Sequence, residues 1–532
     1  GGGGREEEGG VKDHLLLQFP RPAALSQQQQ RLIGGASSGL AAPAACPQID
    51  IDFLGGDLTD GTVFGVGTIL GCWSQCRARA DCALFTLSHE VCYLKSSLAT
   101  PRSAPGALSA SRSCGLRFGT AAGRPDLAAV FGAEDGGYQG ADSGASVRLA
   151  DRTYLWLWGD TLVGKTLFGG AQRSIERMPR QSLAKLDVIE STPGQPNISA
   201  LKPQYFLPTD RDQYFPAEWY PIYWLIEGQV GERTGALFVQ VWNIWGGVQG
   251  HARTMLAVNN PTAHPDAWQI REGLIPANTS CNYAHGMHQD PGSEWVYLLG
   301  SCDSYAVIAR GREVDLQALR LDLLQYWDGQ DWTPNSTSQA PLFHFHWSSE
   351  ASLKWHPKHQ MWYVPLLQSI DPTLRLATAP QLTGPWSVQE VYTIPDVWGA
   401  SQNRSAYAAK SHPELATDPD SLIISYNTNS MADEHGNWQR FLSENRGMAN
   451  ASVYRLQFVE LRPTALRGEI AEFEAEALAA EKALKAATAA AAAPPNDVSG
   501  LSAGSRQGGT RSDLWRLAAP SVAAAALTGA GA

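Results

Sequence analysis

The chain has 532 residues, with 41 Lys and Arg against 52 Asp and Glu, so its formal net charge at pH 7 is −11. This acidic balance argues against a protein that binds nucleic acids through a basic surface, because such binding needs cationic side chains to displace counterions. No stretch reaches the roughly 18 consecutive apolar residues of a membrane-spanning helix. The low charged fraction of 17%, with 52 Gly and 32 Pro, favours a turn-rich β protein over a helical bundle.

Residues 1–45 begin with four glycines and include the run Gln27–Gln30. Their composition offers no apolar pattern that could form a core. We therefore expect a disordered leader.

The cysteines predict an oxidising compartment. Six of the eight fall between residues 46 and 115, and Cys281 and Cys302 form a second group. An even number in such groups is typical of disulfides in secreted or surface proteins. A zinc site built on Cys72-x-x-x-Cys76 is the alternative. Five Asn-x-Ser/Thr sequons support secretion and glycosylation: Asn197, Asn278, Asn335, Asn403 and Asn450.

The segment 46–115 contains a helix signal followed by a hairpin signal. CWSQCRARADC, from Cys72 to Cys82, predicts one amphipathic helix in which Cys72 and Cys76 share a face. ALFTL and VCYLK then predict two paired strands. This arrangement resembles a PAN/Apple domain. The resemblance implies the bridges Cys72–Cys92, Cys76–Cys82 and Cys46–Cys114, and a module that binds proteins or carbohydrates without catalysis.

Between about residues 125 and 462, one pattern occurs five times. A polar residue precedes an apolar strand, a tight turn follows, and a second strand rich in Trp, Tyr, Leu and Val ends in small polar residues. The passages begin near Asp142, Glu218, His285, Glu350 and Tyr407. Each is long enough for one four-stranded sheet, so a mainly β fold with a five-bladed β-propeller is expected. A β-sandwich is the alternative.

In a propeller, the repeated strands would bring several of these residues to one mouth. Asp142 opens a strand and Asp160 closes its hairpin partner, so we expect the two to meet there, with Glu218, His285 and Glu350. Glycoside hydrolysis needs such a pair of carboxyl groups, one as base or nucleophile and one as acid. The alternative is a purely structural role, in which each acidic residue only caps a turn or starts a strand.

The same region contains motifs found together in one group of enzymes. They are D-x-G-x-S-V-x-L, L-W-L-W-G-D-T, M-P-R-Q-S-L-A, E-A-S-L, L-x-G-P-W, and S-H-P-E-L followed by I-I-S-Y-N-T-N. They resemble the five-bladed-propeller glycosidases, which include arabinanases and β-xylosidases. The resemblance is strongest to a Gly-Asp-Thr-signature family, some of whose members look like endo-D-arabinofuranan hydrolases.

Position by position, this resemblance implies a role for each acidic residue. Asp142 matches the general base or nucleophile, and Glu350 matches the general acid. Asp160 would tune a pKa or bind a sugar hydroxyl. Glu218 lies where the family often has an aspartate that modulates a pKa.

Other side chains are candidates for substrate binding. Arg180 could bind a sugar or pair with an acid. His285 could ligate an ion on the axis or be an ordinary hydrogen-bonded histidine. His412 is better placed near the mouth, unless Pro413 simply ends a strand there. Trp219, Trp224, Trp347 and Trp398 are candidate sugar platforms, although packing between sheets uses most tryptophans in such folds. Cys281–Cys302 would staple the third hairpin. No motif demands a metal or an organic cofactor.

Residues 463–532 are expected to contain an Ala-rich helix, from Gly468 to about Ala491, and then a low-complexity tail. The closing stretch also fits a glycolipid-anchor signal, since small residues and a polar spacer precede it.

Two functions are compatible with these features. The first is a secreted or surface glycoside hydrolase acting on a cell-wall polysaccharide that contains arabinose or another pentose. The second is a non-catalytic surface adhesin that binds glycans or proteins. A polysaccharide or glycan is the expected partner of the large region.

Overall fold

The computed structural model describes residues 48–464 with gaps, together with residues 478, 479, 482 and 486. The gaps are residues 65, 67–68, 89–90, 97–99, 113–116, 135, 171, 193, 209–221, 246–247, 250–253, 276–280, 303, 346–349, 369–371, 396–403 and 431–453. The expected leader, most of the C-terminal region and nine highlighted residues lie outside the described part: Cys46, Cys114, Glu218, Trp219, Asn278, Trp347, Trp398, Asn403 and Asn450. The four described residues of the expected Ala-rich helix are helical and exposed.

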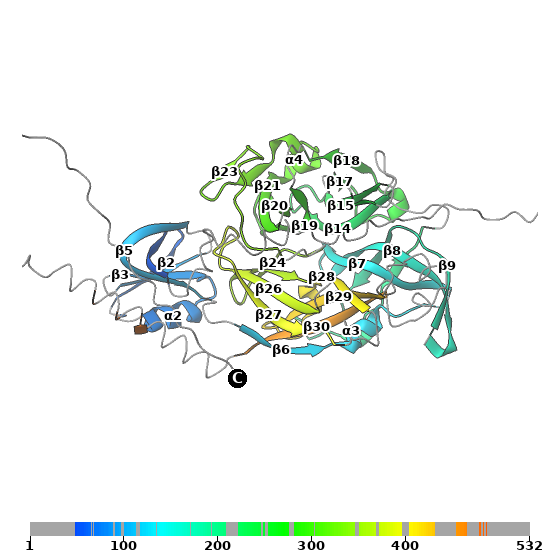
Figure 1. The fold of residues 1–532 in the computed structure, drawn as a ribbon, viewed down its shortest axis with the longest axis horizontal. Coiled ribbons are helices and arrows are strands. Elements are labelled where there is room, and N and C mark those ends of the chain that lie inside the picture. The colour runs from blue at the N-terminus through cyan, green and yellow to red at the C-terminus, as the bar shows by residue number, and fades with distance from the viewer. Residues whose placement is uncertain are drawn as a thin grey trace, which may run out of the picture. The chain divides into compact units, whose positions relative to one another are not determined.

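Residues 48–111 form a five-stranded antiparallel sheet with one helix against it (Figure 1). The order of its strands in space is β1-β5-β3-β4-β2. Along the chain the elements are β1 (Gln48–Leu54), β2 (Asp57–Phe64), α2 (Ile69–Ala78), β3 (Leu84–Ser88), β4 (Val91–Lys95) and β5 (Thr100–Ser111). The predicted hairpin is confirmed by the antiparallel pair β3 and β4.

Helix α2 differs from the expected one at both ends, because it begins at Ile69 and ends at Ala78. A disulfide joins Cys76 to Cys82 with 5.2 Å between their Cα atoms. Six residues of continuous α-helix would separate them by about 9 Å along the axis, which is too far for a disulfide. The chain must therefore leave the helix after Ala78 and turn back.

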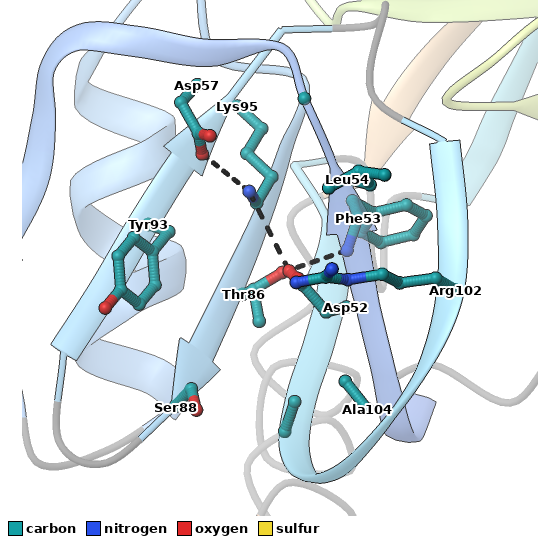
Figure 2. A pocket seen from close by; sticks show the side chains of 12 residues that line it. Asp52, Phe53, Leu54, Asp57, Thr86, Ser88, Tyr93, Lys95, Arg102 and Ala104 are labelled. Atoms are coloured by element: carbon teal, nitrogen blue, oxygen red, sulfur yellow. Dashed lines mark hydrogen bonds and ion pairs between the residues drawn. The ribbon is translucent and has the colours of Figure 1, made fainter.

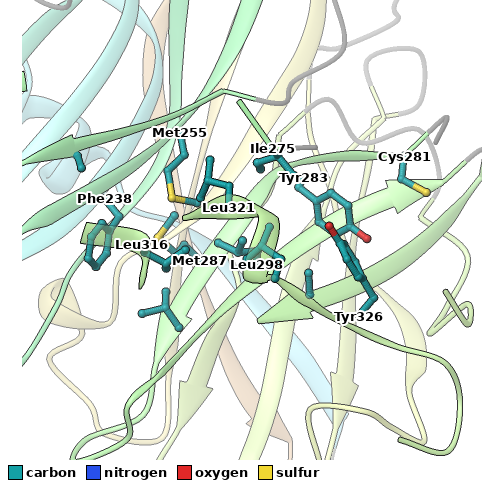
Figure 3. Packing of buried hydrophobic residues seen from close by; sticks show 14 of the residues in the cluster. Phe238, Met255, Ile275, Cys281, Tyr283, Met287, Leu298, Leu316, Leu321 and Tyr326 are labelled. Atoms are coloured by element: carbon teal, nitrogen blue, oxygen red, sulfur yellow. The ribbon is translucent and has the colours of Figure 1, made fainter. Parts of the chain in front are cut away.

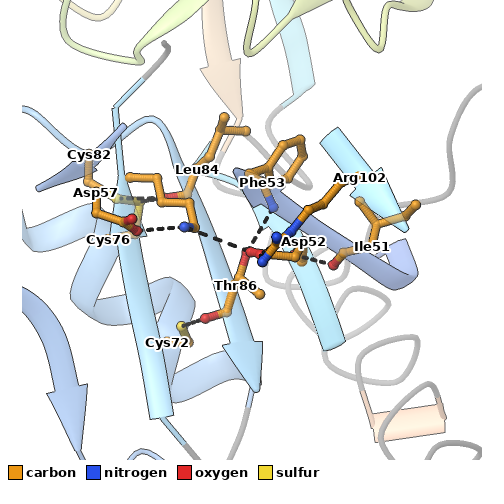
Figure 4. Close-up of polar contacts among 12 residues, drawn as sticks. Ile51, Asp52, Phe53, Asp57, Cys72, Cys76, Cys82, Leu84, Thr86 and Arg102 are labelled. Carbon is orange, nitrogen blue, oxygen red and sulfur yellow. Dashed lines mark hydrogen bonds and ion pairs between the residues drawn. A yellow bond between two sulfur atoms is a disulfide. The ribbon is translucent and has the colours of Figure 1, made fainter. Parts of the chain in front are cut away.

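The two described bridges of this sheet are those that the resemblance implies. Cys72 is bonded to Cys92, and Cys76 is bonded to Cys82 (Figure 4). All four residues are fully buried beside Phe85 in an apolar cluster. The alternative of a zinc site at Cys72 and Cys76 is therefore wrong, since both sulfur atoms are in disulfides.

Loss of the Cys72–Cys92 bridge should destabilise this sheet by about 2–4 kcal/mol. The bridge spans 20 residues, whereas Cys76–Cys82 spans 6. Because a longer loop loses more freedom on closure, the Cys72→Ala/Cys92→Ala variant should lose more stability than Cys76→Ala/Cys82→Ala. Hydrogen exchange of β3 and β4 amides would measure both losses. An equal or larger loss for the shorter loop would contradict this expectation.

The remaining described strands form five successive antiparallel sheets of four or five strands and one short pair (Figure 1). The first two sheets have the orders β13-β10-β8-β7, with β9 beside β8, and β14-β15-β17-β18, with β16 beside β15. Their strands are β7 (Gly137–Ala150), β8 (Thr153–Leu167), β9 (Gln172–Arg177), β10 (Ser182–Asp187), β13 (Gln204–Phe206), β14 (Ile222–Val230), β15 (Leu237–Trp245), β16 (Val248–Gln249), β17 (Thr254–Val258) and β18 (Ile270–Leu274). Between β10 and β13, β11 (Glu190–Thr192) pairs with β12 (Gln195–Pro196).

The other three sheets have the orders β19-β20-β21-β22-β23, β24-β25-β26-β27 and β28-β29-β30-β6. Two short helices, α3 (Pro125–Val130) and α4 (Glu313–Gln317), accompany them. The strands are β19 (Asn282–Gln289), β20 (Trp295–Cys302), β21 (Tyr305–Arg312), β22 (Gln325–Trp327), β23 (Trp332–Thr333), β24 (Lys354–His356), β25 (Met361–Leu366), β26 (Thr373–Ala379), β27 (Ser387–Thr393), β28 (Arg404–Ser411), β29 (Leu422–Ser430), β30 (Arg455–Thr464) and β6 (Arg117–Gly123).

All five expected hairpins are confirmed, by the pairs β7–β8, β14–β15, β19–β20, β24–β25 and β28–β29. The first strand of the fourth hairpin is shorter than expected, because residues 350–353 are irregular and β24 begins only at Lys354. The polar groups of this segment bond to neighbouring sheets. The Ser352 hydroxyl donates to Glu227, 2.7 Å away, and accepts from the Ser411 amide.

The sheets follow one another in space as well as in sequence. Strand β7 contacts β14 and β28, and β14 also contacts β19. The last sheet is completed by β6, which pairs with β30. A strand that precedes all five sheets thus ends up beside the last one, so the two ends of this region are held together.

Neighbouring sheets pack through apolar clusters. Figure 3 shows the cluster between the second and third sheets, where Phe238 and Met255 approach Met287 and Leu298. Cys281 lies at its edge and is bonded to Cys302, as expected for a staple on the third hairpin. Within the described residues, no helix is long and apolar enough to span a membrane.

Candidate active site

Asp142 and Asp160 lie on the paired strands β7 and β8. Ala141 pairs with Thr161 and Ser143 with Trp158, so a bulge at Asp142 places it beside Gly159 and Asp160. A Cβ atom added at Gly159 would lie 3.4 Å from the Cβ of Asp142. Both aspartates were expected at strand ends, but they lie well inside these two long strands.

Two tyrosines of the fifth sheet hold the carboxyl group of Asp142. The hydroxyl of Tyr407, in β28, donates to Oδ1, and that of Tyr454, just before β30, donates to Oδ2. Hydrogen bonds from phenols stabilise the charged form of a carboxylate. Although part of Asp142 is exposed, its carboxyl group is therefore fixed in orientation.

Left-handed backbone conformations gather around this carboxyl group. Ser143, Ala408 and Tyr454 have φ angles of 65°, 55° and 58°. Ser143 follows Asp142 in the chain and Ala408 follows Tyr407, while Tyr454 itself donates to Asp142. Each such conformation costs about 1–3 kcal/mol for a residue with a side chain, and such strain concentrates at functional sites.

Gly140 should not tolerate a side chain, because of both its backbone conformation and its close contact with Tyr454. Its φ is 150°, and an added Cβ would lie 2.1 Å from the carbonyl oxygen of Tyr454. Gly140→Ala should therefore displace Tyr454 and cost about 1–3 kcal/mol or more. Gly123→Ala, with nothing within 4 Å of the added atom, is the matched control. Urea unfolding of both variants would test this, and equal stabilities would contradict it.

Asp160 is held by a cation and an indole. Arg180 Nη1 lies 3.4 Å from Oδ2 and the Trp224 indole nitrogen lies 3.3 Å from Oδ1. Only 6% of Asp160 is exposed, whereas Arg180 and Trp224 are partly exposed. Arg180 therefore pairs with an acidic residue, which was one of its two expected roles, and that residue is Asp160.

Glu350 is buried beside a lysine that is itself buried. Lys410 Nζ lies 3.6 Å from Glu350 Oε2, and 7% of Glu350 and none of Lys410 is exposed. The ammonium also donates to the carbonyl oxygens of Ile226 and Ala351. Ser143, next to Asp142, hydrogen-bonds to Glu350. Lys410 therefore links the segment of Glu350 to the second and fifth sheets.

The electrostatics of the three carboxyl groups are coupled. Burial, followed by the charge of Asp160, raises the pKa of Asp142 well above its usual range, although the two tyrosines act in the opposite direction. Burial also raises the pKa of Asp160, against the effect of Arg180, and that of Glu350, against the effect of Lys410. Glu350 contributes to the raised pKa of Asp142, so all three groups belong to one cluster.

A second buried glutamate, Glu227, lies in β14 and was not predicted. None of it is exposed, and its oxygens lie 2.7 Å from the Ser352 hydroxyl and 3.6 Å from Lys354 Nζ. Glu218, the residue chosen for this sheet, lies outside the described residues. A charged residue inside an apolar strand is rarely accommodated without a partner, and this signal could have identified both Glu227 and Lys410.

The two predicted histidines are used structurally. His412 is fully buried, bonds to the hydroxyls of Ser146 and Ser425 and stacks on Trp156. Both of its ring nitrogens thus have partners, and none of the side chain is exposed to a substrate. His285 is 3% exposed, bonds to the Ser301 hydroxyl 2.8 Å away and packs against aromatic rings.

The cluster thus combines three carboxyl groups of raised pKa with two cations and two phenols. Asp142, Tyr407, Arg180 and Trp224 are each partly exposed, which places one side of the cluster at the surface. Such a group can accept and donate protons and can bind hydroxyl groups. Residues from the first, second and fifth sheets and from the segment before β24 contribute to it.

Several solved structures are similar to the chain. A protein from Bacteroides ovatus, provisionally described as a hydrolase, has 16% identity and a TM-score of 0.46, covering 64% of this chain and 89% of that one. The α-L-arabinofuranosidase PaAbf62A from Podospora anserina has 13% identity and a TM-score of 0.33, covering 62% and 94%. The β-xylosidase RS223 has 12% identity and a TM-score of 0.35, covering 62% and 92%. At these values the neighbours do not by themselves assign an activity.

No curated protein matches the sequence. One family model does, over residues 129–464, which include all five sheets except β6. The chain therefore belongs to the family described as a domain of unknown function, DUF5005.

Proposed function

We propose that the protein is a glycoside hydrolase whose acidic residues are Asp142, Glu350 and Asp160. The observation that supports this best is the coupled cluster of these carboxyl groups, each of which has partners in the protein that stabilise its charged form. Hydrolysis of a glycosidic bond needs one carboxyl group that gives a proton and another that takes one or attacks the sugar. The sequence motifs point to the same chemistry independently.

In this proposal Asp142 is the general base or nucleophile. A raised pKa makes it a stronger base, and the hydroxyls of Tyr407 and Tyr454 orient it. In an inverting reaction it would take a proton from the water that attacks the anomeric carbon. In a retaining reaction its carboxylate would attack that carbon directly, and water would later release the sugar.

Glu350 is the proposed general acid. Its raised pKa lets it keep a proton to higher pH than an exposed glutamate would, and it would give that proton to the oxygen of the leaving group. The Lys410 ammonium, 3.6 Å away, would then stabilise the carboxylate that remains. Asp160 would bind a sugar hydroxyl or modulate the pKa of Asp142, with Trp224 beside it as a candidate contact.

We also propose that the five sheets are the blades of a five-bladed propeller. Two observations support a closed ring of blades. The first sheet contacts both the second and the fifth, through β7 with β14 and β28. Strand β6, from the start of the region, pairs with β30 at its end. Residues 46–115 would be a PAN/Apple-type module, and the disulfides and sequons support secretion.

An activity screen tests the function. Purified protein would be incubated with arabinans, arabinogalactans and xylans, and released reducing sugar would be measured. We expect release from a pentose-containing polymer by the wild type only, with Asp142→Asn and Glu350→Gln as controls. Binding of a polymer without release of sugar, equal in all three proteins, would instead favour the non-catalytic adhesin.

A further inference from the structure

The small sheet of residues 48–111 contains a pocket of about 350 Å³ (Figure 2). This volume is within the range of about 300–1,000 Å³ that is usual for small-molecule sites. Two aspartates, a lysine and an arginine dominate the lining. The full lining is Asp52, Phe53, Leu54, Gly55, Asp57, Thr86, Ser88, Tyr93, Lys95, Arg102, Ala104 and Ala107.

The charged side chains of the pocket compensate one another. Lys95 Nζ lies 2.6 Å from Asp57 Oδ1 and 3.7 Å from Asp52 Oδ1. Arg102 donates from Nε and Nη2 to Asp52 Oδ2, at 3.0 and 2.8 Å. Two cations thus face two carboxylates, and the pocket has no formal net charge.

These groups are held by a buried framework. Only 5% of the Lys95 side chain is exposed. Thr86, which is 1% exposed, accepts hydrogen bonds from the Ser109 hydroxyl and the Phe53 amide (Figure 4). Burial alone would raise the pKa of Asp52, but its hydrogen bonds from Arg102 and Thr86 and the charge of Lys95 lower it. The carboxylate is therefore ionised and fixed in orientation at neutral pH.

We propose that this pocket binds one neutral saccharide unit. A sugar has hydroxyl groups that both donate to carboxylates and accept from ammonium and guanidinium groups, so it can use both members of each ion pair without separating them. The ring of Tyr93 and the side chains of Phe53 and Leu54 offer apolar surface to its C–H faces.

A charged ligand fits the pocket less well. It would have to displace one partner of an existing pair, which leaves a partly buried charge without compensation. The same reasoning argues against an acidic peptide or a sulfated chain. This site is separate from the carboxyl cluster of the five sheets, so the proposal does not depend on hydrolytic activity.

The test uses the full chain with Asp142→Asn, so that no ligand is consumed. D-arabinose, L-arabinose, D-xylose, D-galactose and D-glucose would be titrated by saturation-transfer NMR, with D-glucuronate as the charged counterpart of glucose. We expect at least one neutral sugar to bind. Arg102→Ala should then weaken it about tenfold or more, because a hydrogen bond to a charged group is lost.

Two further variants keep the result interpretable. Lys95→Met should also weaken binding about tenfold or more. The Arg102→Ala variant is not expected to disturb the core, because 54% of the Arg102 side chain is exposed. Arg79→Ala removes a surface pair with Asp81 in the same module and should leave affinity unchanged. Failure of every neutral sugar to bind, unchanged affinity in Arg102→Ala, or tighter binding of glucuronate than of glucose would overturn the proposal.

Discussion

Replacement of Glu350 by Gln, and separately of Asp142 by Asn, should each lower the kcat of glycoside hydrolysis by about 10²–10⁴-fold. Both substitutions keep the shape of the side chain and remove its ability to exchange a proton. Because both groups are coupled in one cluster, the double variant should lose little more than the worse single variant.

Leaving-group dependence separates the two roles. An aryl glycoside whose phenol leaves without protonation should restore much of the activity of Glu350→Gln and little of that of Asp142→Asn. Asp187→Asn and Glu176→Gln are the controls, because they replace acidic residues in the sheet that contains Asp142 but outside the carboxyl cluster. Asp187 is exposed, and Glu176 pairs at the surface with Lys165. Both should retain full kcat. Full activity in Asp142→Asn or Glu350→Gln would rule out the proposed roles.

The pH dependence of the wild type follows from the directions of the pKa shifts. Activity should fall at acidic pH as Asp142 becomes protonated and at alkaline pH as Glu350 loses its proton. Burial raises both pKa values, so both limbs should lie at higher pH than for the same groups in water. An acidic limb at the ordinary pKa of an exposed aspartate would contradict the buried cluster.

Lys410→Met should lower the free energy of unfolding at neutral pH by about 3–5 kcal/mol, because it leaves the buried Glu350 without its cation. The same substitution in a Glu350→Gln background should cost much less, since no carboxylate then remains. Urea unfolding of the four proteins of this double-mutant cycle would give the coupling free energy directly. A cost that is equal in both backgrounds would show that Lys410 only fills space.

The effect of Lys410→Met should also depend on pH in one direction. Burial raises the pKa of folded Glu350 above its model value of 4.5, and Lys410 opposes this shift. Without Lys410 the folded state holds this proton more tightly, so stability is lost as pH rises from that value through the folded pKa. Wild type and variant should therefore differ least at acidic pH, where Glu350 is protonated in both states, and most at neutral pH.

The sequence by itself determined the local features of this protein. Alternating apolar strands and tight turns identified all five hairpins, because a hairpin depends on neighbours in the chain. Asp142 and Asp160 were expected together for the same reason, since β7 and β8 form one hairpin. The first strand of the fourth hairpin begins later than expected because the polar groups of residues 350–353 bond to other sheets, which no local pattern records.

Only the tertiary structure decided what surrounds these carboxyl groups. Tyr407 and Tyr454 reach Asp142 from 265 and 312 residues away. Lys410 likewise reaches Glu350 from a distant part of the chain, since it lies 60 residues further on, in strand β28 of the fifth sheet. His412 looked like a mouth residue but became a buried partner of two serines. Hydrogen bonding and desolvation act through space, so the pKa shifts that make acidic residues useful arise only once the sheets pack together.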